Sequence, residues 1–70
     1  MFEVGQLVYT NREIRGWFNY SVKAAIPANL RGKIVGISKE SDTVEDVIYE
    51  VEFDREFGRY NINHSSLKLG

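Results

Sequence analysis

The sequence contains no cysteine and a single histidine among its 70 residues. The lack of cysteine excludes disulfide bonds, thiolate catalysis and cysteine-ligated zinc sites. The histidine, His64, cannot form a zinc site alone, and its neighbours Ser65 and Ser66 are too close in sequence for the geometry of a nucleophile and its base. We expect His64 to cap or pack a turn.

Other chemical signatures are missing as well. Asp42, Glu45 and Asp46 lack the spacing and the glycine of a calcium-binding loop. No glycine-rich phosphate-binding loop is present. We therefore expect a protein that is not an enzyme, with no catalytic residues, no metal site and no cofactor.

No apolar run approaches the roughly 18 residues of a membrane span, and residues 1–6 lack the basic start and apolar core of a signal peptide. This favours a cytoplasmic protein that does not bind membranes. Hydrophobic residues make up 43% of the chain and charged residues 27%, which is typical of a folded domain. At this length we expect one domain over residues 1–70, with a small core, as a monomer or weak homo-oligomer.

The formal net charge of −1 hides an uneven distribution. Residues 1–33 carry a net charge of +3, residues 34–58 carry −6, and residues 59–70 carry +2. If the fold separates these segments, one surface is mildly basic and another is acidic, which affects how partners are steered. The alternative is that both segments simply form solvated strand faces.

Two central strands are predicted over residues 31–38 and 46–53, joined by a polar connection over residues 39–45. In the second strand, apolar residues from Val47 to Phe53 alternate with mostly polar ones, which is the period of a half-buried strand. Further strands are predicted over residues 6–10, 57–63 and 67–69, with a single helical turn at residues 63–66. The chain is therefore predicted to be all-β with five strands.

The predicted core consists of the inward positions of these strands. Ile34 and Ile37 are three residues apart, so both face inward only if a β-bulge lies at Val35 and Gly36. The expected core residues are Val8, Ile34, Ile37, Val47 or its neighbours, Tyr49, Val51, Phe53, Tyr60, Ile62 and Leu67.

Residues 11–29 show no sustained period, since a helical pattern fails at Gly16 and Pro27, so we predict a long loop. Long loops in compact domains are often functional. This segment holds the candidate partner-binding residues Trp17, Phe18, Tyr20, Arg12 and Arg15. The alternative is that its aromatic side chains close the open end of a barrel and complete a small core.

The order of these elements resembles the SH3-like small barrels. Within them the chain is similar to the variable chain of ferredoxin–thioredoxin reductase and to the small extrinsic β-barrel subunit of photosystem I. The matching residues are Val4-Gly5, the run Arg31-Gly32-Lys33-Ile34-Val35-Gly36-Ile37, the run Val51-Glu52-Phe53-Asp54-Arg55-Glu56-Phe57, and Leu67. The chain is also similar to KOW-type RNA- and ribosome-associated barrels around Gly32 to Ile37. The resemblance implies a five-stranded SH3-like small barrel with a long first loop, in an accessory or binding role without chemistry of its own.

The aromatic and basic side chains of the segment 11–29 are consistent with two kinds of partner. A protein partner would use the aromatic residues as anchors and the arginines as a rim. A nucleic acid would use the basic residues for phosphates and the rings for bases, as in a KOW-like or ribosome-associated module. The pI near 5.7 favours the protein partner, because nucleic-acid-binding domains are usually basic as a whole.

Overall fold

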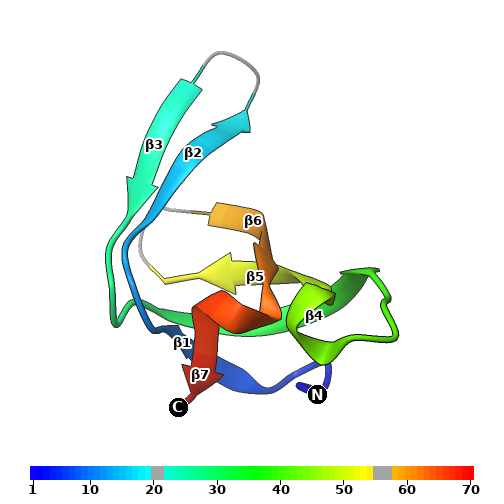
Figure 1. The fold of residues 1–70 in the computed structure, drawn as a ribbon. Coiled ribbons are helices and arrows are strands. Elements are labelled where there is room, and N and C mark those ends of the chain that lie inside the picture. The colour runs from blue at the N-terminus through cyan, green and yellow to red at the C-terminus, as the bar shows by residue number, and fades with distance from the viewer. Residues whose placement is uncertain (20–21, 55–57) are drawn as a thin grey trace.

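The computed structural model describes residues 1–19, 22–54 and 58–70, with side chains for all of these except residues 16–19 and 22–24. In chain order its elements are β1 (Leu7–Thr10), β2 (Ile14–Asn19), β3 (Val22–Ile26), β4 (Arg31–Lys39), the 3₁₀ helix η1 (Val44–Asp46), β5 (Ile48–Phe53), β6 (Gly58–Asn63), the 3₁₀ helix η2 (His64–Ser66) and β7 (Leu67–Leu69) (Figure 1). These residues contain no α-helix, which confirms the all-β class. Within the same ranges no helix is long and apolar enough to cross a membrane.

Five strands form one sheet in the order β6-β5-β4-β1-β7, and every neighbouring pair in it is antiparallel. The strands β2 and β3 form a second sheet of their own. In β1, β5 and the first half of β4, buried residues alternate with more exposed ones, so one face of the large sheet packs on the core. No ladder joins β6 to β7 in the described part of the chain, so the large sheet keeps two open edges and a closed barrel is not confirmed.

The five predicted strands correspond to β1, β4, β5, β6 and β7, and the predicted helical turn corresponds to η2. Between β4 and β5 the chain also forms η1, which the polar composition of that connection did not indicate. The clear strand signals are those of the half-buried sheet, because alternation appears in a sequence only where one face of a strand is covered.

The prediction of a long loop over residues 11–29 is wrong, because this segment contains the hairpin of β2 and β3. The pairing is irregular between Trp17 and Asn19, where the register shifts. Such a shift interrupts the two-residue period. Gly16 and the pair Ala24-Ala25 are also poor strand formers. The hairpin therefore leaves little trace in the sequence pattern.

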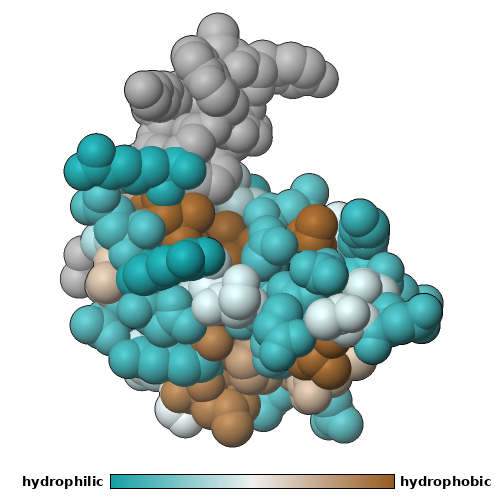
Figure 2. Space-filling model, viewed as in Figure 1, coloured by the Kyte–Doolittle hydropathy of each residue, from teal (hydrophilic) through white to brown (hydrophobic). Residues whose placement is uncertain are grey.

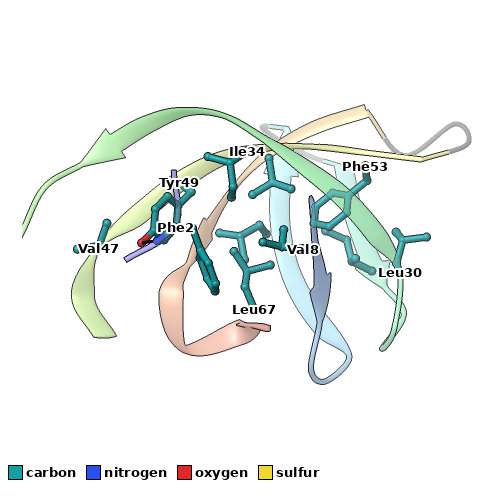
Figure 3. Close-up of a cluster of buried hydrophobic side chains, with 11 residues drawn as sticks. Phe2, Val8, Leu30, Ile34, Val47, Tyr49, Phe53 and Leu67 are labelled. Atoms are coloured by element: carbon teal, nitrogen blue, oxygen red, sulfur yellow. Dashed lines mark hydrogen bonds between the residues drawn. The ribbon is translucent and has the colours of Figure 1, made fainter. Parts of the chain in front are cut away.

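The core lies on the inner face of the large sheet, and residues from segments outside that sheet complete it (Figure 3). Its buried residues are Phe2, Val8, Ile26, Leu30, Ile34, Val47, Tyr49, Val51, Phe53, Ile62 and Leu67, with Ile14 and Tyr60 partly buried against them. Figure 3 shows Phe2, Val47 and Tyr49 at one end of this cluster and Leu30 and Phe53 at the other. Phe2, Ile26 and Leu30 were not predicted, because they lie outside the strands that the sequence pattern indicates.

The strand β4 contains the predicted bulge. Ile34 pairs with Val51 while Gly36 pairs with Glu50, so Val35 is an extra residue. The bulge places Ile37 opposite Tyr49, on the same face as Ile34. Ile37 is nevertheless 39% exposed, so its predicted place in the core is wrong. It shares the core's side of the sheet without being covered there. On the face of the domain shown in Figure 2, hydrophilic side chains cover most of the described surface, and hydrophobic ones show only in places between them.

Candidate functional site

The hairpin of β2 and β3 stands away from the large sheet as a two-stranded ribbon (Figure 1). Its register pairs Ile14 with Ile26 at the base and Trp17 with Lys23 farther out. A ribbon of two strands is at best marginally stable alone. Its position therefore depends on how its base is attached to the rest of the domain.

The outgoing end of the hairpin, after β3, is fixed by Thr10 on β1. The Thr10 hydroxyl group donates a hydrogen bond to the Pro27 carbonyl (2.7 Å) and accepts one from the Leu30 N–H (3.0 Å). The backbone of Thr10 also accepts from the Asn29 N–H at 2.8 Å and donates to the Leu30 carbonyl at 3.1 Å. Thr10 is fully buried, as is Ile26 at the end of β3. The chain leaving the hairpin is thus attached to β1 by both polar and apolar contacts.

The incoming end is held by η2. The Asn11 N–H donates to the Ser66 carbonyl at 3.0 Å, and Asn11 Nδ2 donates to the Ser65 carbonyl at 2.9 Å. The Arg12 guanidinium donates to Ser66 Oγ, at 2.9 Å from Nη2 and 3.3 Å from Nε. Ile14 then packs against the core. Both ends of the hairpin are therefore anchored, and its direction relative to the sheet is fixed.

The partner-binding residues predicted within the segment 11–29 belong to this hairpin or to its base. Arg12 lies at its base in contact with Ser66, and Arg15 forms an exposed ion pair with Glu13. Trp17 and Phe18 belong to β2, but their side chains are outside the described residues, as is Tyr20 altogether. The hairpin thus carries the predicted aromatic residues, while its two arginines are engaged within the chain.

The outer face of the large sheet shows the charge separation that the sequence suggested. The strands β7 and β4 carry basic residues and no acidic ones, and β1 between them carries no charged residue, whereas β5 carries Glu50 and Glu52 and the connection before it is acidic. One ion pair joins the two regions, Arg31 on β4 with Asp54 after β5 at 2.7 Å, and a second joins β6 to β5, Arg59 with Glu52 at 2.8 Å. The hydrogen bond and charge of these carboxylates raise the pKa of each arginine, so both remain cationic.

His64 packs within the turn η2, as predicted. Its ring stacks on Phe2 with the ring centroids 4.6 Å apart, and its Nδ1 lies 3.0 Å from the Tyr49 hydroxyl group. In the same region Met1, Glu40, Ser41, Asp42 and Val47 line an open groove of about 510 Å³. No cluster of His, Asp and Glu residues in the described ranges is arranged to hold a metal ion.

Comparison with protein-family models, with curated proteins and with solved structures gives no match. The geometry of the chain itself is therefore what supports a function. One cluster was missed in the sequence: Tyr9, Arg31 and Lys68 lie side by side on the outer face, because β1 pairs with both β4 and β7. The basic residues of these segments were visible in the sequence, but the strand pairing that brings them together was not.

Proposed function

We propose that the protein is a non-catalytic binding module of SH3-like architecture that recognises a protein partner through the hairpin of β2 and β3. Trp17, Phe18 and Tyr20 are the proposed anchors. Arg12 and Arg15 flank them at the base. This assignment concerns binding alone, and no step of chemistry is attributed to these residues.

The SH3-like assignment is supported by the strand order. The five strands run β7-β1-β4-β5-β6 across the sheet, the hairpin is inserted after the first of them in the chain, and a single 3₁₀ turn precedes the last. This arrangement resembles the small barrels named above, which serve as accessory or binding modules. Fold likeness alone does not identify a partner.

The observation that carries the proposal is the anchored, projecting hairpin. Its base is fixed on one side by Thr10 and on the other by Ser66. Binding orders surface groups at a cost in free energy, and a preorganised element lowers that cost. Aromatic residues also dominate the binding energy of protein interfaces. An anchored ribbon whose sequence gathers Trp17, Phe18 and Tyr20 is therefore suited to recognise a protein.

Site-specific photo-crosslinking tests this proposal. A benzophenone amino acid is placed at Tyr20 in one variant and at Asn61, an exposed residue of β6, in a matched control. Both are irradiated in a lysate of the source organism, and the adducts are identified by mass spectrometry. A partner captured at Tyr20 and not at Asn61 supports the hairpin, and the reverse pattern contradicts it.

The purified partner then allows a quantitative test. Tyr20→Ala should weaken binding by about 1–3 kcal/mol, because truncating an aromatic anchor removes a large share of interface energy. Arg15→Ala should cost less than about 1 kcal/mol, because exposed charges contribute little. Circular dichroism confirms that each variant is folded. An equal loss from the two substitutions would argue against aromatic anchoring.

A further inference from the structure

The outer face of β7, β1 and β4 is a second surface with its own chemistry. Where β4 pairs with β1, the exposed basic residues on it are Lys68 on β7 and Arg31 and Lys33 on β4, and Lys39 lies at the far end of β4. None of these three strands contains Asp or Glu. The face combines positive charge with the ring of Tyr9 at its centre.

Tyr9 is directly opposite a cation on both sides. It pairs with Arg31 on β4 and with Lys68 on β7, so the three side chains form one row across the sheet. Strands in a sheet lie about 4.8 Å apart, which places the two cations on strands about 10 Å apart with the ring between them. In the next row Leu7, which is 51% exposed, pairs with Lys33.

The ring of Tyr9 is held in place by its surroundings. A Cβ atom added to Gly70 would lie 2.5 Å from Tyr9 Cε1, so the last residue of the chain packs closely against one edge of the ring. Tyr9 itself is only partly buried. A fixed, partly exposed ring between two cations is a suitable platform for stacking.

The cations differ in how far they are neutralised. Arg31 is paired with Asp54, whereas neither Lys33 nor Lys68 forms an ion pair among the described residues. Lys68 donates a hydrogen bond from Nζ to Asn29 Oδ1 at 2.8 Å, which positions it beside β1 without cancelling its charge. Lys33 lies opposite Glu52, but that carboxylate is bonded to Arg59. The face therefore keeps a net positive charge.

We propose that this face binds single-stranded nucleic acid, with a base stacked on Tyr9 and phosphates contacted by Lys68, Arg31 and Lys33. Basic residues that follow the backbone and aromatic rings that stack on bases are the usual elements of such sites. The carboxylates of β5 and of residues 40–46 repel a polyanion, so the strand is confined to β7, β1 and β4. An acidic protein segment would also be attracted by the cations, but it would leave the central ring without a stacking partner.

The size of the surface sets the expected affinity. Three cationic contacts to a single strand predict a slope of about −2 for log K against log salt concentration. Non-specific binding of this kind has dissociation constants on the order of 10⁻⁴ to 10⁻⁶ M. The proposed binding is therefore weak, and it is strongest at low salt.

Fluorescence anisotropy of a labelled oligo(dT) of about 15 nucleotides tests the proposal in a buffer of about 20–200 mM salt. The wild-type protein should bind with the slope given above. Lys68→Gln and Lys33→Gln should each weaken binding several-fold and reduce the slope by about 0.7, because each removes one phosphate contact. Lys39→Gln is the matched control, since Lys39 ends β4 beyond the patch, and it should change affinity less than about twofold.

The role of the ring is tested separately. Tyr9→Leu should weaken binding at least about fivefold with little change in the salt slope, and Tyr9→Phe should restore it, because the phenyl ring still stacks. Thermal melts verify that each variant is folded, and Lys68→Gln tests the face even if Tyr9→Leu does not fold. Poly-L-glutamate of equal charge should compete poorly.

Three results would overturn the proposal: no binding by the wild-type protein at the lowest salt, equal binding by the Tyr9→Leu and wild-type proteins, or equal competition by poly-L-glutamate. The last two would assign the face to acidic proteins or to polyanions in general. None of them affects the hairpin, because Tyr20 and Arg15 variants are assayed against a different partner.

Discussion

The hydroxyl group of Tyr49 lies 3.0 Å from Nδ1 of His64, and it joins the N-terminal segment to the last turn of the chain. The same oxygen accepts a hydrogen bond from the Phe2 N–H at 3.1 Å. Since that bond uses the oxygen as an acceptor, the phenol proton is free to point at Nδ1. Nδ1 accepts that proton in the tautomer with hydrogen on Nε2, and the direction of the bond reverses in the other tautomer. Every buried side-chain N or O atom in the described residues has a hydrogen-bond partner, and this chain of contacts is part of the reason.

Tyr49→Phe should destabilise the protein by about 1–3 kcal/mol, because the buried Phe2 N–H loses its acceptor while the ring is kept. In a domain of this size, that corresponds to a fall in melting temperature of several degrees for each kcal/mol. The measurement is urea denaturation followed by circular dichroism. A variant as stable as the wild type would mean that water replaces the hydroxyl group at this position.

Gly32 and Gly36 lie on the same strand but should respond differently to substitution. A Cβ atom at Gly32 would lie 2.6 Å from Val51 Cγ1 and 2.9 Å from Phe53 Cδ1, both on buried side chains. At Gly36 the nearest atom, Glu50 Oε1, would be 3.6 Å away, which is an ordinary contact.

Gly32→Ala should therefore cost about 1–3 kcal/mol through overpacking. Gly36→Ala should be neutral or stabilising by up to about 1 kcal/mol, because alanine restricts the unfolded chain. Paired denaturation curves compare the two directly. If Gly36→Ala is the more harmful change, the bulge requires glycine for its backbone and the contact argument is wrong.

Val51→Ala tests the register of the central strand. Val51 is fully buried and pairs with Ile34 on β4 and with Tyr60 on β6. Removing two methyl groups there should cost roughly 2–3 kcal/mol from lost burial and the cavity that remains. Glu52→Ala, at the exposed neighbouring position, is the control and should change stability by less than about 1 kcal/mol. Similar melting curves for the two variants would show that the alternation has been assigned to the wrong face.

The large sheet could be predicted because its strands are covered on one side. Val47 to Phe53 alternate in sequence for the same reason that Tyr49, Val51 and Phe53 are buried in the fold. The bulge at Val35 was also visible, because Ile34 and Ile37 break the alternation by one residue. The predicted burial of Ile37 was wrong, because a residue that shares a sheet face with Tyr49 is buried only if other residues also cover it.

The hairpin and the outer-face cluster could not be predicted for two different reasons. The strands β2 and β3 form their own sheet, so coverage of one face does not impose a clear period on them. The row of Lys68, Tyr9 and Arg31 depends on pairing between the two ends of the chain and its middle. Single-sequence patterns record local periodicity, not which distant strands become neighbours. The buried Phe2 was missed for the same reason, because its partner Tyr49 is far along the chain.

The attachment of the hairpin leads to a prediction about local stability. The Thr10 hydroxyl group bridges the Pro27 carbonyl and the Leu30 N–H, and Thr10 is fully buried. Thr10→Val keeps the shape of the side chain but removes both hydrogen bonds, leaving the Leu30 N–H without its partner. We expect a loss of about 1–3 kcal/mol in the free energy of unfolding, because a buried donor without an acceptor bears its full desolvation cost.

The same substitution should loosen the hairpin more than the sheet, because the bonds it removes lie at the base of β3. Amide hydrogen exchange should therefore accelerate for residues 25 and 26 and for Leu30 to a greater extent than for β5, where exchange requires opening of the core. Thr10→Ser is the matched control, since it retains the hydroxyl group and loses a methyl group. It should leave the exchange pattern of the hairpin close to that of the wild type, although its global stability falls through lost burial. A uniform acceleration throughout the chain in Thr10→Val would show that this threonine supports the whole domain and does not selectively fix the direction of the hairpin.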